Sequence, residues 1–331
     1  MNAERHSATM PNSVARTGAA SAPAGIDRAL PLAHTALASV LEGLAALREP
    51  LLYHPVPGNA GDSAINAATY QLFDRFGLAF ERVGDDVDAA TTRGRVVVCS
   101  GGGNLVPFYS DMRHFVARHH AGCRQLVLLP ATMRGHEDLL GALGRHVTLL
   151  CRDRPSFEHV FKHAPNARVE ASHDVALHLN VEALRTKARQ QFLPLVSSPA
   201  QARRNLRRRW RALRYDQRNV SNPGELFAFR TDVEGLPGRA QNEANLDVSV
   251  EFVSDDMSPA LTLEATWRML GFLDRYPTVH TDRLHVAILS GLLGKAVRMH
   301  DNSYGKNRVV YEHSLHDAFP TVTPMWTQAK P

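Results

Sequence analysis

Apolar positions follow two alternating patterns along this chain, and the alternation predicts an α/β fold. Short continuous apolar runs lie at 51–53, 95–99, 125–129 and 147–151, and such runs are typical of strands buried in a parallel sheet. Segments with the spacing of amphipathic helices separate them, at 25–47, 62–73, 111–119, 137–143 and 156–162. Regular strand–helix alternation of this kind indicates a doubly wound parallel sheet.

A second α/β unit follows after an interruption. The stretch 181–223 breaks the alternation and ends in a loop-forming Asn-Val-Ser-Asn-Pro-Gly sequence. Strands are then expected at 226–229, 278–280 and 296–300, with helices at 263–273 and 284–293. We therefore expect two Rossmann-like domains in a GT-B-like arrangement, with the active site in the cleft between them, because ligands of open sheets lie beyond the carboxyl ends of the strands.

The expected boundaries follow from these patterns and from composition. They are a disordered tail at 1–24, an N-terminal domain at 25–180, an Arg-rich inter-domain segment at 181–223, a C-terminal domain at 224–316 and an irregular tail at 317–331.

Composition narrows the class of protein. The chain has 331 residues, which suggests two domains, and 44% of them are hydrophobic, which suits ordinary globular cores. Its three cysteines, Cys99, Cys123 and Cys151, lack the pairing and spacing of a disulfide framework or a zinc site. No apolar stretch has the length of a signal peptide core or a transmembrane helix. We expect a cytoplasmic protein with no bound metal or cofactor.

Positive charge is concentrated in one segment. The chain carries 38 Lys+Arg and 33 Asp+Glu, a net charge of +5, and eight arginines fall within 203–218. Leu206, Trp210 and Leu213 share one face of a helix there, so the segment suits weak association with an anionic membrane. The alternative is a surface helix whose apolar residues pack on the domain below. Nucleic acid is not expected as a partner, because few aromatic residues accompany the arginines.

Two glycine-containing turns follow predicted strands. In the first, GNAGDS at 58–63, glycine permits a tight turn and the helix start offers N–H groups to an anion, although a turn capped by Asp62 explains much of the pattern. In the second, GGGN at 101–104, three consecutive glycines favour close approach of a ligand or of another backbone segment over a flexible loop.

Charged residues follow three other strands. Arg152 lies in CRDRPS, where the alternative is a surface pair with aspartate. The segment 280–285, HTDRLH, combines two histidines with Asp and Arg, which suits acid–base chemistry on an anionic substrate better than metal binding. Lys306 lies in DNSYGK, which is suited either to phosphate or to a simple turn.

In order along the chain, these motifs resemble the polysaccharide pyruvyl transferases. The resemblance covers 51–308 and rests on GNAGDSAI, GGGN, CRDRPS, HDVALHL, TDRLHVAILSGLLGK and DNSYGK. It implies that the Arg-Leu-His element at 283–285 binds phosphoenolpyruvate and supplies the active-site histidine. It also implies an upstream arginine for the donor, for which Arg152 matches best and Arg230 is a second candidate. The Arg-rich segment is not part of the pattern.

The resemblance implies a reaction and a set of site residues. His285 would protonate the methylene carbon of the enol, one sugar hydroxyl would attack the resulting centre, and a second would displace phosphate to close a cyclic ketal. The expected catalytic residues are His285, Asp62 and Asp282. The expected substrate-binding residues are Arg283, Leu284, Arg152, Arg230, Gly61, Gly102, Gly103, Asn104, His280 and Lys306.

Two other functions remain open from the sequence. A nucleotide-sugar glycosyltransferase of polysaccharide biosynthesis would use the same fold and a similar His/Arg cleft, and fold alone does not distinguish them. A non-catalytic polysaccharide-assembly protein would keep the fold without turnover. The acceptor is expected to be a sugar of an exopolysaccharide or its precursor, and a lipid-linked acceptor would suit an enzyme held at the inner face of the membrane.

Overall fold

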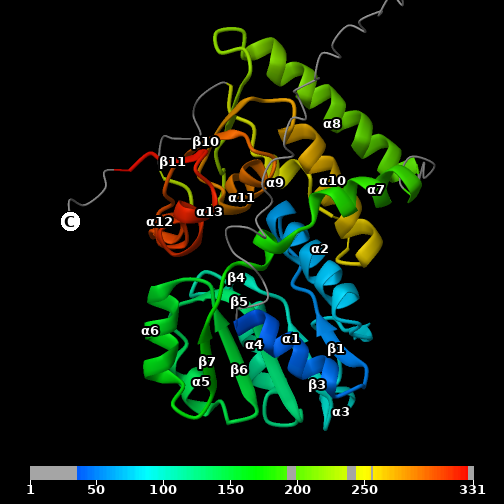
Figure 1. Ribbon diagram of the computed structural model, residues 1–331, viewed down its shortest axis with the longest axis vertical. Helices are drawn as coiled ribbons and strands as arrows, with labels where there is room; N and C mark the ends of the chain where they lie inside the picture. The colour runs from blue at the N-terminus through cyan, green and yellow to red at the C-terminus, as the bar shows by residue number, and fades with distance from the viewer. Residues whose placement is uncertain (1–35, 192–198, 237–243, 255, 327–331) are drawn as a thin grey trace, which may run out of the picture.

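The computed structural model describes residues 36–191, 199–236, 244–254 and 256–326, and it contains two parallel β-sheets (Figure 1). The expected tail at 1–24 lies outside these residues. The α/β class predicted from the alternating pattern is confirmed.

The first sheet has the strand order β2-β1-β3-β5-β6-β7, with β4 paired to β5, and every pairing is parallel. Its strands are β1 (Leu51–His54), β2 (Phe80–Arg82), β3 (Val96–Cys99), β4 (Gly102–Leu105), β5 (Gln125–Met133), β6 (Val147–Cys151) and β7 (Arg168–Ala171). The four predicted strands are β1, β3, β5 and β6, which form the buried centre of the sheet.

Helices cover both faces of this sheet. Successive strand residues point to opposite faces, so Tyr53 and Val98 pack with α1 and α2, whereas Leu52 and Cys99 pack with α4, α5 and α6. The helices are α1 (Ala36–Ala46), α2 (Ala60–Arg75), α3 (Ala89–Thr92), α4 (Asp111–His119), α5 (Glu137–Ala142) and α6 (Arg154–His163). Continuous apolar strands are the consequence of this two-sided burial.

The second sheet has the order β11-β10-β9-β8, also parallel. Its strands are β8 (Glu225–Ala228), β9 (Thr278–Thr281), β10 (Ala296–Met299) and β11 (Val322–Pro324). The accompanying helices are α9 (Val248–Glu251), α10 (Pro259–Leu273), α11 (Leu284–Leu292), α12 (Lys306–Val310), a π-helical turn (Tyr311–Leu315) and α13 (His316–Ala318).

One continuous apolar cluster joins the two sheets. Helix α2 packs against α10, and a 3₁₀ turn, η3 (Val175–His178), packs against both α2 and α11. In Figure 1, α2 and η3 lie in the middle of the molecule, between the two sheets. The start of α2 and the start of α11 are thereby brought close together.

Several elements differ from the sequence prediction. The helix expected within the Arg-rich connection is confirmed as α8 (Pro199–Arg218), but the connection also contains α7 (Val181–Gln191), and the expected irregular tail contains β11. Strands β2 and β7 lie at the sheet edges and keep exposed polar residues, so they carry no apolar run. The GGGN turn itself contributes β4, which pairs with the extended end of β5.

Among the described helices, none is both long and apolar enough to cross a membrane.

Candidate active site

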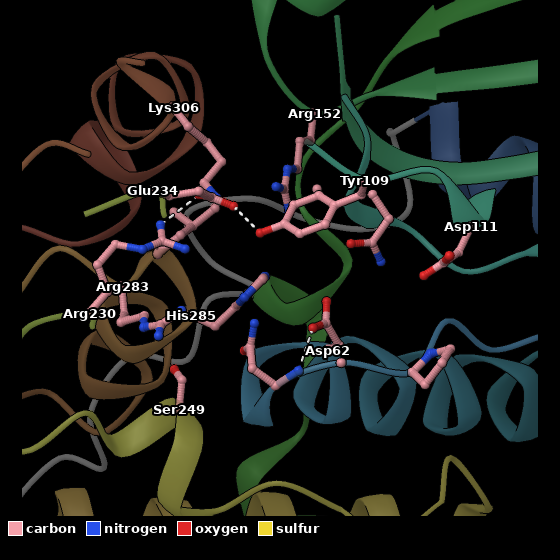
Figure 2. Close-up of a pocket in the computed structure, with 16 residues that line it drawn as sticks. Asp62, Tyr109, Asp111, Arg152, Arg230, Glu234, Ser249, Arg283, His285 and Lys306 are labelled. Carbon is pink, nitrogen blue, oxygen red and sulfur yellow. Dashed lines mark hydrogen bonds and ion pairs between the residues drawn. The ribbon is translucent and has the colours of Figure 1, made fainter. Parts of the chain in front are cut away.

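A polar pocket lies where the strand-to-helix connections of both sheets meet (Figure 2). From the first half of the chain it is lined by Pro57, Gly58, Asn59, Asp62, Gly103, Asn104, Tyr109, Asp111 and Arg152. From the second half it is lined by Arg230, Glu234, Ser249, Arg283, Leu284, His285 and Lys306. Segments nearly 250 positions apart therefore supply one site.

The first wall is the start of α2. Asn59 caps this helix by accepting a hydrogen bond from the Gly61 N–H at 2.7 Å, and Asp62 closes the capping box by accepting from the Asn59 N–H at 2.8 Å. Burial raises the pKa of Asp62, and the opposing charges of His285, Lys306 and Arg152 act against this shift. The pKa of the Asp62 carboxyl group is therefore closer to neutral than that of an exposed aspartate, which suits the group to proton transfer.

His285 lies directly against this turn. A Cβ atom added to Gly61 would be 2.3 Å from His285 Nδ1, so the imidazole occupies the space that any side chain at position 61 would need. On its other side, His285 Nε2 faces Asp174 Oδ2 at 3.5 Å. An aspartate against one ring nitrogen fixes the orientation of the ring and leaves the other nitrogen for proton transfer.

Arg152 connects this pair to the first sheet. Its side chain is only 1% exposed, Nη1 donates to Asp174 Oδ2 at 2.6 Å, and Nε donates to Thr132 Oγ1 at 3.0 Å. Burial alone would raise the pKa of Asp174, but the charges of Arg152 and His285 hold it well below the usual range. Asp174 therefore stays ionised between Arg152 and His285.

Arg152 and Lys306 converge on the GGGN turn. A Cβ atom at Gly103 would lie 3.4 Å from Arg152 Nη2 and 3.8 Å from Lys306 Nζ. Lys306 Nζ also donates to Glu234 Oε2 at 2.6 Å. Burial lowers the pKa of Lys306 to about 8, although Glu234 opposes the shift. The glycine keeps open a space bordered by two cations, which is the arrangement expected of an anion site.

The other two arginines bind carboxylates of the protein. Arg283 donates to Asp247 through Nε at 3.0 Å and Nη2 at 2.5 Å, and its Nη1 lies 2.7 Å from Asp232. Arg230 bonds to Asp232 at 2.7 Å and to Glu234 at 2.6 Å. Arg152 and Lys306 also have carboxylate partners, Asp174 and Glu234. They differ from the other two cations because Arg152 Nη2 and Lys306 Nζ both lie beside the space above Gly103.

Nine of the thirteen predicted site residues line the pocket, and four do not: Gly61, Gly102, Asp282 and His280. Gly61 lies directly against the His285 ring. Gly102 lies beside Asp62 and has a φ of +120°, a backbone conformation that favours glycine. Asp282 is fully buried and accepts a hydrogen bond from the Arg230 N–H at 2.8 Å. His280 stacks on Phe227 and faces Glu225 at 3.2 Å. Neither Asp282 nor His280 lines the pocket.

Sequence reasoning missed two residues that line the pocket, Glu234 and Tyr109, and a buried partner of its residues, Asp174. Asp174 follows the polar edge strand β7, which has no apolar run to mark it. Glu234 and Tyr109 lie in connections far apart in the sequence, yet the Tyr109 hydroxyl donates to Glu234 Oε1 at 2.9 Å (Figure 2). Only the position of Asp174 within the HDVALHL motif gave a signal.

Fold and pocket together define a parallel α/β protein with a polar pocket lined by arginines, a lysine and a histidine. The chain belongs to the polysaccharide pyruvyl transferase family, whose sequence profile matches residues 59–304. The family supports a role in pyruvyl transfer in polysaccharide biosynthesis, with a polysaccharide acceptor.

Two relatives extend this comparison. The chain is 25% identical over 288 residues to the Bacillus subtilis (strain 168) protein named "Putative pyruvyl transferase EpsO", a match that covers 81% of this chain and 85% of the relative. A crystal structure of a functionally uncharacterized protein from Klebsiella pneumoniae subsp. pneumoniae NTUH-K2044 is similar with a TM-score of 0.68 and 27% identity. That similarity covers 89% of this chain and 99% of the other.

Proposed function

We propose that the enzyme transfers the pyruvyl group of phosphoenolpyruvate to two hydroxyls of one sugar, forming a cyclic ketal and releasing phosphate. The observation that carries this proposal is the convergence of Arg152 Nη2 and Lys306 Nζ on the space above Gly103. Phosphoenolpyruvate carries a carboxylate and a phosphate, and charge-assisted hydrogen bonds from two buried cations suit such a dianionic end. In this proposal the two sheets form a GT-B-like pair and the pocket is their shared cleft.

The residues of the pocket can perform each proton transfer. His285 adds a proton to the methylene carbon, which becomes the methyl group, and the first sugar hydroxyl attacks the adjacent carbon. The carbon–oxygen bond to phosphate then breaks as the second hydroxyl attacks. Asp62, whose pKa is raised by burial, accepts a hydroxyl proton and passes it to the departing phosphate, and His285 recovers its proton from the other hydroxyl. No resident cofactor enters this scheme.

Asp174 orients His285, the proposed proton donor, and links it to Arg152, the proposed ligand of phosphoenolpyruvate. It faces His285 Nε2 and accepts from Arg152 Nη1, so the same carboxylate orients both residues. Phosphoenolpyruvate bound at Arg152 would therefore lie next to the carboxylate that orients His285.

The first prediction tests the class of donor. Purified enzyme, incubated with phosphoenolpyruvate and an oligosaccharide acceptor, is expected to release inorganic phosphate only when both are present. The measurement is phosphate release together with the mass of the acceptor, which should increase by one pyruvyl ketal. Turnover with nucleotide sugars instead would identify a glycosyltransferase, and no acceptor-dependent turnover across both donor panels would favour the non-catalytic assembly role.

We also propose that α8 holds the enzyme against the anionic inner face of the cytoplasmic membrane, close to lipid-linked acceptors. Leu206, Trp210 and Leu213 are 58%, 58% and 55% exposed, so the alternative in which they pack on the domain below is wrong. The opposite side of the helix provides the contacts: Tyr215 is buried, and Arg208 donates to the backbone carbonyls of Glu251 and Val253. Figure 1 shows α8 along one outer side of the molecule.

The arginines flank the exposed stripe. At about 100° per residue, Arg203, Arg207 and Arg214 lie on one side of the stripe and Arg209 on the other. A tryptophan and two leucines between basic residues are typical of helices that lie in a membrane interface. Each basic residue near an anionic surface adds about 1 kcal/mol, and salt screens this attraction.

The second prediction concerns this helix. The enzyme should sediment with phosphatidylserine-containing vesicles at low salt and should be released as the salt concentration rises. Changing Arg203, Arg207 and Arg214 to Gln should reduce binding at least tenfold, by loss of about 1 kcal/mol for each residue. A matched variant with Arg93, Arg145 and Arg154 changed to Gln loses the same charge elsewhere and should bind normally. Equal loss in both variants would show that only net charge matters.

A further inference from the structure

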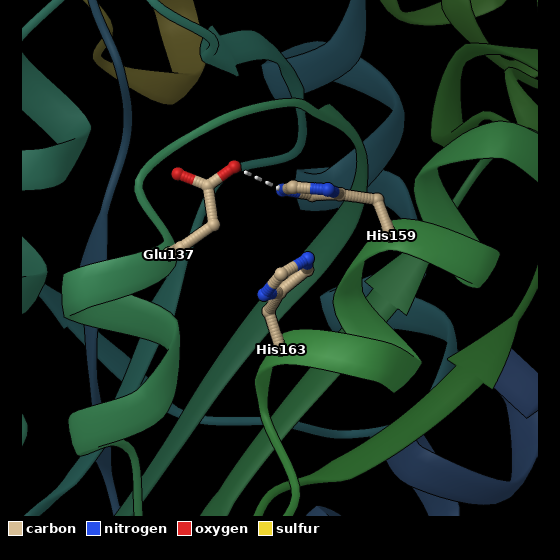
Figure 3. A group of neighbouring side chains, drawn as sticks. All are labelled: Glu137, His159 and His163. Atoms are coloured by element: carbon tan, nitrogen blue, oxygen red, sulfur yellow. Dashed lines mark ion pairs between the residues drawn. The ribbon is translucent and has the colours of Figure 1, made fainter.

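We infer that Glu137, His159 and His163 form a binding site for one divalent transition-metal ion, separate from the active-site pocket (Figure 3). Each residue offers one ligand atom, and these atoms all lie within 4.8 Å of one another. None of the three lines the pocket described above. The proposal therefore concerns a second site, on the α5–α6 side of the first sheet.

The helical spacing brings the two histidines together. His159 and His163 are four residues apart on α6, so they share one face of the helix, and their ring centroids are 4.9 Å apart. Both side chains are half-buried, which limits their rotation. Two histidines on successive helical turns are a frequent basis for metal coordination.

Glu137 supplies the carboxylate from a different element. It lies in the first turn of α5, and its Oε1 is 3.8 Å from His159 Nε2. With metal–ligand bonds of 2.0–2.1 Å, two ligand atoms in a tetrahedral site lie about 3.3 Å apart. A shift of about 0.5 Å, within the reach of an exposed glutamate side chain, would therefore bring the two atoms to this separation.

The turn before α5 provides an additional oxygen. His159 Nε2 donates to the Gly135 carbonyl oxygen at 2.9 Å, and both Gly135 and His136 have positive φ, at 65° and 60°. A non-glycine residue in this conformation is uncommon and is found where the surrounding structure requires it. A metal bound to Nε2 would break this hydrogen bond and push the carbonyl oxygen aside by about 0.4 Å, to the separation of about 3.3 Å at which it could serve as a fourth donor.

The ligand set indicates the class of ion. Two imidazoles with a carboxylate suit Zn²⁺ and its neighbours Co²⁺ and Ni²⁺, whereas Mg²⁺ and Ca²⁺ prefer sites made of oxygen atoms alone. The group contains no cysteine, which removes the preference for soft ions such as Cu⁺.

The location gives the ion a structural consequence for the enzyme. It would join the β5–α5 turn to α6, which begins directly after Asp153. From the same turn, Arg134 donates to Asp153 at 2.9 Å, and Thr132 of β5 both donates to Asp153 and accepts from Arg152. The ion would therefore restrain the β5–α5 turn and the start of α6, beside Thr132 and Asp153, which form the hydrogen-bond network next to Arg152.

The third prediction is tested with untagged, chelator-treated enzyme titrated with Co²⁺ or Zn²⁺. We expect one ion per chain by native mass spectrometry, and a visible Co²⁺ spectrum of low coordination number. His163→Gln should weaken affinity at least roughly tenfold, since even residues that only orient ligands alter metal affinity by 10–100-fold. Glu137→Gln should do the same, which keeps the test valid if one variant misfolds.

The matched control is His313→Gln. His313 and His173 form a similar pair, with ring centroids 5.2 Å apart, but they belong to no ligand group found among the described residues. This variant should bind the ion as tightly as the unaltered enzyme. No stoichiometric binding, or equal affinity in the unaltered, His163→Gln and Glu137→Gln proteins, would overturn the proposal.

Discussion

Replacing His285 with alanine is expected to lower kcat by about 10²–10⁴-fold, the usual contribution of a general acid–base group. The physical reason is the location of the imidazole between Asp174, which orients it, and the start of α2, where Asp62 lies. The side chain fills a polar pocket rather than the apolar core, so the variant should remain folded. The measurements are steady-state phosphate release and thermal unfolding.

A matched control separates this effect from the general loss of a histidine. His280 lies only five residues earlier, stacks on Phe227 and faces Glu225 outside the pocket lining. His280→Ala should therefore keep kcat within severalfold of the unaltered enzyme. Near-normal turnover by His285→Ala, or equal losses in both variants, would remove His285 from the proposed chemistry.

The central strands could be predicted from the sequence, because strands buried on both faces consist almost entirely of apolar residues. β3 and β6 are covered on both faces by helices, which requires an unbroken apolar run. The edge strands β2, β7 and β11 were missed, since their partners on one side, and not their own residues, define them. Strand β4 was missed because glycine is a poor strand former, and β4 forms here by pairing with the buried end of β5.

The site could be predicted only in part. Position at a strand end identified Arg152, Arg283 and Lys306 as pocket residues, because parallel strands direct their following loops to one edge. Position at a strand end could not reveal that Arg283 donates two hydrogen bonds to Asp247, since the two residues are 36 positions apart. The sequence does not distinguish one arginine from another. Which of them points into the open space of the pocket depends on where the carboxylates lie in the folded chain.

The apolar stripe of α8 shows the same limit. Its spacing predicts a shared face for Leu206, Trp210 and Leu213, but spacing is identical for a face that packs inward and one that points outward. The orientation is decided by contacts elsewhere, including the bonds from Arg208 to the carbonyls of Glu251 and Val253. Only the folded chain distinguishes the two alternatives.

Adding a single methyl group at position 61 is expected to lower kcat strongly, although His285 itself is unchanged. A Cβ atom at Gly61 would lie 2.3 Å from His285 Nδ1 and 2.9 Å from Cγ, so the imidazole must move away from its present place. Misplacement of a catalytic group by about 1 Å can cost about 10²-fold in rate. We expect Gly61→Ala to lower kcat by roughly that factor.

Stability should change little, because the better helix propensity of alanine is offset where the added Cβ would lie 2.9 Å from Oδ1 of the capping Asn59 side chain. Gly61 lies in the first turn of α2 without a positive φ, and alanine is a better helix former than glycine by roughly 1 kcal/mol. The matched control is Gly271→Ala in α10, where an added Cβ meets nothing within 4 Å, and which should keep full activity. A loss of activity in both variants would point to a general effect of helix stiffening.

The double variant provides the decisive comparison. If Gly61→Ala acts by displacing His285, then Gly61→Ala combined with His285→Ala should be no slower than His285→Ala alone, because a group already removed cannot be displaced. The two losses would then be strongly non-additive in a cycle based on kcat. Multiplication of the two losses would instead assign Gly61 a role independent of His285, such as direct approach of the substrate to the backbone of α2.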